Sequence, residues 1–418
     1  MTPHPADRVA RHELRRLAQS FGLDVIGGSL RRTSSRFCLG VEHGDYNGTE
    51  LFGVGTDRFL WLACKPNDSG RVRIASANFV HDGLIEFVPG QTPGPSSREL
   101  RNGWGRFALG ADWVLRRAGF ATQRGFDAAI FGNIPGGGMS RSASLTLNLL
   151  LTMADANGLA FEGGMQVVDL AQAVENDYVG SPCGVLDQVM IYFARAGMGT
   201  HYRPRDRTIS YVPLGSTAPD FRLVAMDTGT VRPGLENSTY RMRRAECERI
   251  LAWVQRRRSV DCLAELTDAD DLTAELRRES PELADRLQYL QEAGARFPRL
   301  LQAWQDGDLV TVGSILRADG LGLRNLYKIS GPELESMCEI ARTVPGVLGE
   351  RMLGGGDKGA SGALVLAEAE APLRNAIARE YPRRHPDQTT LWAAHACSIV
   401  DGVAELAPLS RDPDPAAG

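Results

Sequence analysis

Lysine is scarce in this chain of 418 residues and occurs only at Lys65, Lys328 and Lys358, although lysine and arginine together number 47. The basic side chains are therefore nearly all arginines, and with 51 acidic residues they give a formal net charge of -4. Such a balance creates no basic field that would attract nucleic acid or an anionic membrane surface. We therefore expect neither of those partners.

Long apolar runs and paired cysteines are also missing. No apolar run approaches the roughly 18 residues that cross a bilayer, and residues 1–16 contain no apolar signal core. The seven cysteines are scattered without any C-x-x-C spacing, which disfavours a disulfide framework and a zinc site. These absences predict a cytoplasmic protein in a reducing compartment.

Helical and strand patterns follow one another irregularly along the chain. Apolar spacing predicts a helix over residues 7–20, and runs of β-branched and aromatic residues predict strands at 59–64, 72–75 and 85–88. The same criteria predict helices at 104–118, 142–154 and 165–177, strands at 128–131, 221–227 and 363–367, and a mostly helical stretch over 240–344 with breaks near Pro281 and Pro298. A mixture without regular βαβ alternation indicates an α+β fold.

One segment near the N-terminus has the side chains needed to bind a polyol. Within ten residues it places Arg36, Glu42, His43 and Asp45. Carboxylates accept hydrogen bonds from sugar hydroxyl groups, and their spacing can report the configuration of those hydroxyls.

A second segment is suited to phosphate. Gly136, Gly137 and Gly138 let backbone N–H groups approach an anion, and Ser140 and Ser142 precede an apolar helical pattern. A flexible glycine–serine turn capped by serine explains this segment equally well on its own. Polyol and phosphate sites together suggest a sugar kinase.

Five ordered segments resemble the galactokinase group of the GHMP small-molecule kinase family. They are Arg36–Gly48, Pro135–Ser144, Val179–Gln188, Tyr240–Cys247 and Gly354–Gly359, and weaker similarity extends over most of residues 20–400. The resemblance implies a two-domain GHMP kinase fold with the active site in the interdomain cleft. The first domain, residues 1–215, is expected to resemble ribosomal protein S5. The second, residues 216–409, is expected to resemble an α/β plait, followed by a disordered tail at 410–418.

The resemblance also implies roles for individual residues. Asp187 would take the proton of the anomeric hydroxyl, and Arg36 would keep this carboxylate ionised and offset charge on the transferred group. The implied sugar ligands are Glu42, His43, Asp45, Gly184 and Tyr240.

ATP is the implied co-substrate and Mg²⁺ the implied cofactor. The residues expected around ATP are Gly136, Gly137, Gly138, Ser140, Arg141, Ser142, Ala143 and Ser144. Ser142 and Glu175 match magnesium ligands, because Mg²⁺ takes few, hard oxygen donors from the protein. The expected partner is a small-molecule sugar or sugar phosphate, bound by a monomer or homodimer.

The departures from the family pattern cluster in these same segments. The phosphate loop is one residue shorter, Arg141 replaces a serine, and Asp357 and Lys358 replace Phe-Gly. Galactose is the expected substrate, phosphorylated at its C1 hydroxyl. The two added cations also suit a second phosphate, as on the octose 8-phosphate of lincosamide antibiotic biosynthesis, with Lys358 as a ligand. For Lys358, the alternative is a salt bridge to a nearby acid. For the function of the whole chain, a third possibility is an inactive sugar sensor.

Overall fold

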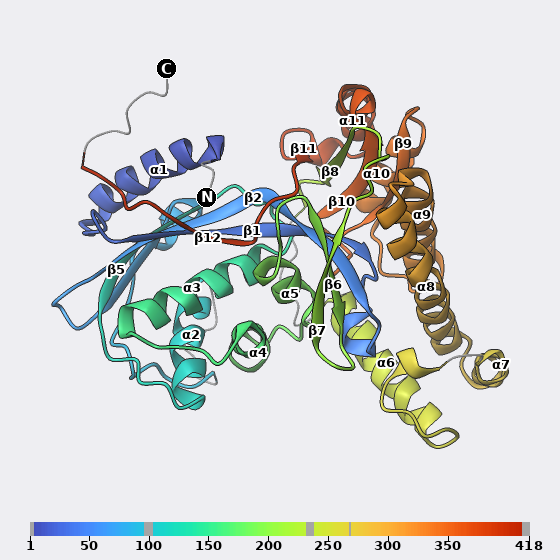
Figure 1. Ribbon diagram of the computed structural model, residues 1–418, viewed down its shortest axis with the longest axis horizontal. Coiled ribbons are helices and arrows are strands. Elements are labelled where there is room, and N and C mark those ends of the chain that lie inside the picture. The colour runs from blue at the N-terminus through green and yellow to red at the C-terminus, as the bar shows by residue number, and fades with distance from the viewer. Residues whose placement is uncertain (1–3, 96–102, 231–237, 267–268, 412–418) are drawn as a thin grey trace.

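The computed structural model describes residues 4–95, 103–230, 238–266 and 269–411. Within these ranges the strands form an eight-stranded sheet and a four-stranded sheet, each with helices packed against it (Figure 1). Sheets and helices follow no regular βαβ alternation, which confirms the predicted α+β class.

The larger sheet runs in the order β12-β1-β2-β5-β3-β4, and β6 pairs with both β2 and β7. Its strands are β1 (Ser29–Gly40), β2 (Leu51–Pro66), β3 (Val72–Ser76), β4 (Ile85–Phe87), β5 (Phe126–Gly132), β6 (Met198–Arg203), β7 (Thr208–Pro213) and β12 (Val403–Leu406). All of its pairings are antiparallel except that of β3 with β5.

Strand β1 is buried at every residue after Ser29, although its sequence contains three arginines. Helix α1 (Pro5–Phe21) packs against one face of the sheet, and α3 (Arg141–Asn157) packs against β1 and β2 on the other (Figure 1). Since both faces are covered, the strand does not alternate between buried and exposed residues. Arg36 is thereby held inside the protein rather than in solvent.

Helix α1 confirms the prediction for residues 7–20. His4 and Asp7 form a capping box at its start, and Gly22 ends it in the left-handed conformation. Its apolar side, with Leu14 and Leu17, packs on the sheet.

The other helices of this half are α2 (Gly105–Arg117), α4 (Gly164–Ala173), the π-helical turn η4 (Val174–Val179) and α5 (Leu186–Tyr192). Helix α5 also packs on β1 and β2, whereas α2, α4 and η4 pack mainly on other helices. The expected phosphate and metal residues Ser142 and Glu175 lie on α3 and η4.

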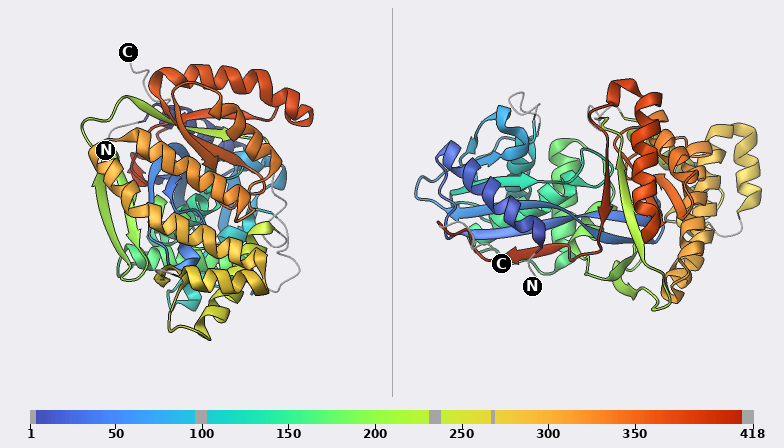
Figure 2. Two further views of the ribbon diagram at one scale, coloured as in Figure 1. Left: turned by 90° about the vertical axis from the view of Figure 1, so that its right-hand side faces the viewer. Right: turned by 90° about the horizontal axis from the view of Figure 1, so that it is seen from above.

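The smaller sheet runs in the order β11-β8-β10-β9. Its strands are β8 (Phe221–Asp227), β9 (Val347–Met352), β10 (Ala360–Leu366) and β11 (Ala393–Cys397). The helices of this half are α6 (Thr239–Gln255), α7 (Asp270–Glu279), α8 (Pro281–Asp306), α9 (Leu309–Asn325), α10 (Pro332–Arg342) and α11 (Glu370–Arg384). Figure 2 shows the two halves side by side along the long axis of the molecule.

The prediction for residues 240–344 is confirmed for the break at Pro281 and wrong for the break at Pro298. Pro281 is the first residue of α8, where its missing N–H has no helical partner to lose. Pro298 lies inside the same helix. The buried side chains of Phe297 and Leu300 flank it, and their packing outweighs the loss of one backbone hydrogen bond.

The end of the described chain returns to the larger sheet. Strand β12 pairs with β1, and Arg11 of α1 donates hydrogen bonds to the carbonyl oxygens of Ala407 and Pro408. The division into domains at residues 215 and 216 stays a prediction, and most of the expected tail, residues 412–418, lies outside the described ranges.

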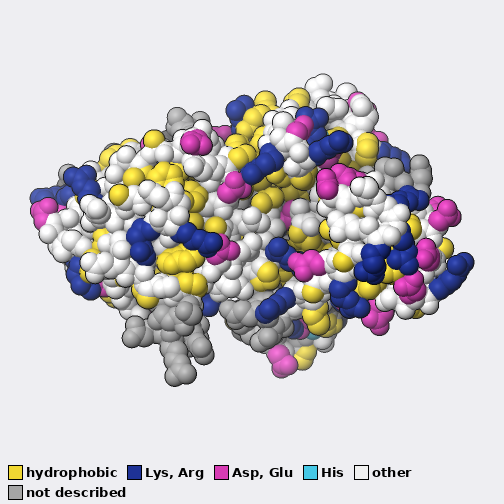
Figure 3. Space-filling view, turned by 90° about the horizontal axis from the view of Figure 1, so that it is seen from below, with side chains coloured by type: hydrophobic (Ala, Val, Ile, Leu, Met, Phe, Trp, Pro, Cys, Tyr) yellow, Lys and Arg dark blue, Asp and Glu magenta, His cyan; other side chains and the backbone are white. Residues whose placement is uncertain are grey.

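Among the helices of the described ranges, none combines the length and apolar character that crossing a bilayer requires. On the face in Figure 3, acidic and basic side chains intermingle over the described surface.

Candidate active site

A cavity of about 360 Å³ brings residues from both halves of the chain together. The predicted site residues all line it, apart from Ala143 and Ser144. Those two residues are buried in α3, and the Ser144 hydroxyl lies 2.8 Å from that of Thr33 on β1. The structure thus places them in the packing between the helix and the sheet.

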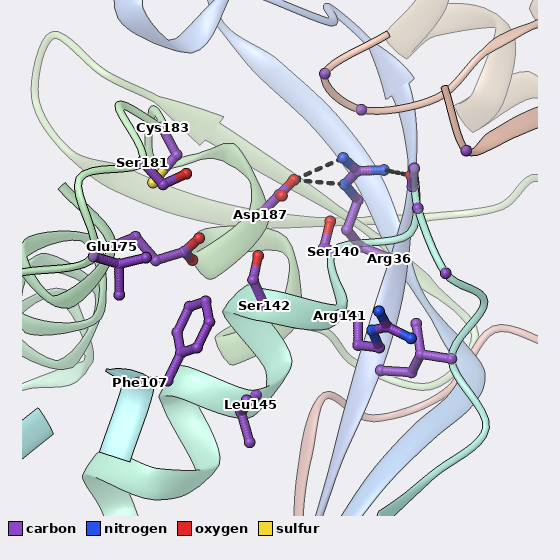
Figure 4. A pocket seen from close by; sticks show the side chains of 18 of the residues that line it. Arg36, Phe107, Ser140, Arg141, Ser142, Leu145, Glu175, Ser181, Cys183 and Asp187 are labelled. Carbon is purple, nitrogen blue, oxygen red and sulfur yellow. Dashed lines mark hydrogen bonds and ion pairs between the residues drawn. The ribbon is translucent and has the colours of Figure 1, made fainter. Parts of the chain in front are cut away.

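Arg36 and Asp187 face one another at the centre of the cavity (Figure 4). Arg36 Nε and Nη2 both donate to Asp187 Oδ1, at 2.9 and 2.7 Å. Its third nitrogen, Nη1, donates to the Gly138 carbonyl at 2.8 Å and so ties the pair to the phosphate loop. Burial by itself lowers the pKa of Arg36, but the neighbouring carboxylates of Asp187 and Glu42 raise it overall.

The two glycine segments predicted from the sequence pack against each other, backbone to backbone. A Cβ added at Gly137 would lie 2.8 Å from Gly359 Cα, closer than two carbon atoms can approach without a shift. Gly359 itself has a φ of +106°, which side chains rarely adopt. Only glycine at both positions permits this contact, which joins the phosphate loop to the turn between β9 and β10.

Asp45 and Gly184 meet at the end of the cavity where sugar ligands are expected. Leu186 N donates to Asp45 Oδ2 at 3.1 Å, and a Cβ at Gly184 would lie 1.8 Å from the same oxygen. The Gly184 N–H donates to the hydroxyl of Tyr240 at 3.2 Å. Burial, with a smaller contribution from the charge of Asp187, raises the pKa of Asp45 to about 6.

His43 is oriented by a chain of hydroxyl groups. Its Nδ1 lies 2.9 Å from the Tyr46 hydroxyl, which lies 2.8 Å from the hydroxyl of Tyr327. The Cys247 thiol lies 3.2 Å from the Tyr327 hydroxyl. These hydrogen bonds connect the loop after β1 with helix α6, so both halves of the protein fix the His43 ring.

Glu175 and Ser142 offer hard oxygen donors beside the phosphate loop. Glu175 is 3% exposed, and its side chain accepts hydrogen bonds from Ser142 and from Gln188. Burial, reinforced by the charge of Asp187, raises the pKa of Glu175 to about 8. A divalent cation would offset the cost of burying this carboxylate, so the two side chains fit Mg²⁺.

Within the described residues, no group of three or more His, Cys, Asp or Glu could hold a metal.

Sequence reasoning missed the apolar end of the cavity. Leu60, Phe79, Trp104, Phe107, Ile130, Ile134 and Leu145 line it. The rings of Phe79 and Trp104 are stacked, with centroids 6.4 Å apart. These residues come from separate strands, helices and turns, so no local pattern could have identified them. Such a wall suits a flat aromatic group such as a nucleobase.

Two polar atoms of the cavity wall lack a hydrogen-bond partner among the residues that the structure describes. They are Trp104 Nε1, at the apolar end, and Ser140 Oγ, in the phosphate loop. Buried donors are normally satisfied, so both atoms point to a ligand that supplies their partners.

The two added cations lie in different surroundings. Lys358 Nζ is 2.7 Å from Glu333 Oε1, which is the salt bridge that the sequence left open as an alternative. The guanidinium of Arg141 lies 5.6 Å from the centre of the Phe79 ring, near the apolar end of the cavity. Burial lowers the pKa of Arg141, and the charge of Asp227 offsets this only in part.

Comparison with known proteins agrees with this geometry. Residues 106–195 match the model of the GHMP kinases N terminal domain. The galactokinase of Exiguobacterium sibiricum is 32% identical over 366 residues, which cover 87% of this chain and 90% of the relative. The galactokinase of Lacticaseibacillus casei is 31% identical over 369 residues, covering 87% and 92% of the two chains.

Solved structures show the same fold. Lactococcus lactis galactokinase complexed with galactose superposes with a TM-score of 0.83 at 27% identity, covering 95% of this chain and 100% of the other. Methanococcus jannaschii mevalonate kinase has a TM-score of 0.60 at 13% identity, covering 89% and 98%, which shows the fold alone. The predicted two-domain GHMP kinase fold is confirmed, and the chain belongs to the galactokinase group of the GHMP kinase family.

Proposed function

We propose that this protein transfers the γ-phosphoryl group of ATP to the anomeric C1 hydroxyl of galactose. The observation that supports this most strongly is the Arg36–Asp187 pair, which lies between a sugar-type ligand set and a glycine-rich phosphate loop in one cavity. The galactose complex of the Lactococcus lactis relative supports the choice of sugar.

Asp187 is proposed to act as the general base. Both donors of Arg36 bind Oδ1, and no described residue donates a hydrogen bond to Oδ2. Oδ2 can therefore take the proton of the C1 hydroxyl as the sugar oxygen bonds to the γ-phosphorus and the bond to the β-phosphate oxygen breaks. ADP leaves, and Asp187 then returns the proton to solvent.

Arg36 is proposed to act on both partners of the reaction. Its guanidinium stabilises the negative charge of Asp187, and its bond to the Gly138 carbonyl holds it beside the loop that would receive phosphate. A fixed cation at this point also favours the charge that develops on the transferred phosphoryl group.

The proposed sugar site is formed by Glu42, His43, Asp45, Gly184 and Tyr240. Asp45 is fixed by the N–H of Leu186, and Tyr240 by the N–H of Gly184, so both acceptors are oriented before sugar arrives. Prior orientation lowers the entropy that binding would otherwise cost.

The proposed ATP site begins at the apolar end of the cavity and continues to the phosphate loop. The unpartnered Trp104 Nε1 can donate to the base, and Ser140 Oγ can bind a phosphate oxygen. Arg141, near the apolar end, would contribute a positive charge to nucleotide binding. Ser142 and Glu175 would hold Mg²⁺, which would neutralise phosphate charge when bound.

Galactose is favoured over a sugar that already carries a phosphate. A second phosphate would need a cation directed at the sugar, whereas Lys358 pairs with Glu333 and Arg141 lies over Phe79. We therefore propose galactose as the substrate, and an octose 8-phosphate is the sugar to compare with it.

A sugar panel assayed for ATP consumption, with the anomeric position of each product resolved by NMR, tests this function. We expect turnover of galactose to galactose 1-phosphate. Faster turnover of octose 8-phosphate than of galactose would identify octose 8-phosphate as the substrate. Tight sugar binding with no ATP consumed by any sugar would instead identify a sensor.

A further inference from the structure

Six charged side chains of alternating sign connect the reaction centre with helix α8. We call them the buried charge row; in order they are Asp187, Arg36, Glu42, Arg351, Asp319 and Arg296. The four inner members are at most 2% exposed, whereas the Arg296 side chain at the outer end is 24% exposed. Alternation of sign lets each inner charge be compensated on both sides.

Arg351 is the member of this row that two carboxylates share. Its Nη2 lies 3.7 Å from Glu42 Oε1, and its Nη1 lies 3.5 Å from Asp319 Oδ2. Its Nη2 donates to the carbonyl of Cys38 at 2.8 Å, and its Nε and Nη1 have no hydrogen-bond partner among the described residues. The guanidinium is therefore held between two negative charges by attraction, and its position depends on both.

Asp319 is held from the opposite side. Arg296 Nε donates to Asp319 Oδ1 at 2.9 Å, and this arginine comes from α8, whereas Asp319 belongs to α9. The carboxylate of Asp319 thus has a fixed position from which it attracts Arg351.

Glu42 is where the buried charge row meets the proposed sugar site. Its Oε1 accepts the N–H of Gly354 at 2.9 Å and lies 3.9 Å from Arg36 Nη1. The Tyr289 hydroxyl donates to the Glu42 carbonyl at 3.0 Å, which fixes its backbone. Movement of Arg351 toward Glu42 would compete with Gly354 for the same oxygen.

We propose that Asp319, which does not line the cavity, is a positioning residue for sugar binding: its charge holds Arg351 back from Glu42 and so keeps the Glu42 carboxylate on Gly354. Without that charge, Arg351 has a single anionic neighbour and closes on Glu42. The proposal rests on the proposed function only in naming sugar as the ligand that Glu42 contacts.

Asp319→Asn tests the proposal in the full-length protein, by steady-state kinetics with galactose and ATP. We expect the KM for galactose to rise about tenfold, in the range seen for residues that act through neighbours, and the KM for ATP to stay unchanged. Asp319→Glu restores the charge and is expected to return the KM for galactose most of the way to the wild-type value.

Glu350→Gln is the matched control. Glu350 is also a buried carboxylate with two arginines, Arg317 and Arg342, and it precedes Arg351 in β9. Within the described residues no hydrogen bond or ion pair joins it to Glu42, so this variant should lose thermal stability as Asp319→Asn does while keeping both KM values. An equal rise in the KM for galactose in the two variants would overturn the proposal.

Amide hydrogen exchange at Gly354 gives a second readout that needs no activity. Exchange should accelerate in Asp319→Asn and not in Glu350→Gln, because only the first frees the Gly354 N–H from Glu42. Unchanged exchange at Gly354 would refute the positioning role even if galactose proved to be the substrate. Absent galactose turnover with faster exchange would instead refute the proposed function alone.

Should Asp319→Asn fail to fold, Arg296→Gln disturbs the buried charge row from its exposed end. Asp319 then keeps its charge with Arg351 as its remaining cationic neighbour in the row, so it should still hold Arg351 back from Glu42. The KM for galactose should stay within about twofold of the wild-type value, and a tenfold rise would count against the proposal.

Discussion

Two nitrogens of Arg36 bind one oxygen of Asp187, and the third binds the carbonyl of Gly138 in the phosphate loop. A single buried guanidinium thus connects the proposed base to the place where phosphate is expected. This arrangement leaves Asp187 Oδ2 without a hydrogen-bond donor among the described residues, and the proposed role of Asp187 as base can be tested by a nearly isosteric change.

Asp187→Asn is expected to lower kcat about 10³-fold, because an amide cannot accept the hydroxyl proton. Galactose binding, measured by calorimetry without ATP, should change little, since the sugar ligands remain. Asp177→Asn, at an exposed ion pair with Arg117, is the control and should keep full activity. Retention of most activity by Asp187→Asn would exclude Asp187 as the base.

Gly184→Ala is expected to raise the KM for galactose by about tenfold or more. The new methyl group would lie 1.8 Å from Asp45 Oδ2 and must displace that carboxylate. Gly294→Ala in α8 serves as the control, because a Cβ there meets nothing within 4 Å. Steady-state kinetics of both variants at saturating ATP would measure the effect. The same KM for galactose in Gly184→Ala and Gly294→Ala would show that Asp45 does not contact sugar.

Arg141→Ser restores the residue that the family pattern has at this position. Loss of the cation should raise the KM for ATP about tenfold and leave the KM for galactose unchanged, since Arg141 lies near the apolar end of the cavity. Arg117→Ser removes an exposed arginine from the neighbouring helix and should change neither value. A selective loss of sugar affinity in Arg141→Ser would place the cation at the sugar instead.

Lys358→Gly is expected to change kcat/KM for galactose by less than about threefold, because Lys358 pairs with Glu333 in a partly exposed salt bridge. Assays with galactose and with an octose 8-phosphate would compare a neutral with a phosphorylated sugar. Selective loss of activity toward the phosphorylated sugar would contradict our assignment and make Lys358 a substrate ligand.

Asp45 should make the stability of the free protein depend on pH. Burial raises its folded pKa to about 6 from 3.8, so the folded state holds this proton more tightly than the unfolded state does. Its contribution to stability is therefore greatest below pH 3.8 and is lost as the pH rises through 6. Asp45→Asn removes the group that titrates, so this variant does not lose stability as the pH rises through 6. Its melting temperature should exceed that of the wild type most clearly above pH 6. A pH-independent difference would show that Asp45 does not titrate in this way.

The sequence was sufficient to identify the family and to predict residues that line the cavity, because those residues lie in short, ordered segments with distinctive chemistry. Arg36, Asp45 and Asp187 were recognised in this way, and the structure brings them together in one cavity. Local apolar spacing likewise predicted α1 and the α+β class. Pro298 shows the limit of local rules, since packing keeps it inside a helix.

What the side chains contact was decided by tertiary structure alone. Lys358 and Glu333 are 25 positions apart, and Arg351 is separated from Glu42 by most of the chain, so no pattern in the sequence could pair them. The apolar wall around Phe79 also assembles from distant elements. Charge pairing and burial depend on distance in space, whereas a motif records only order along the chain.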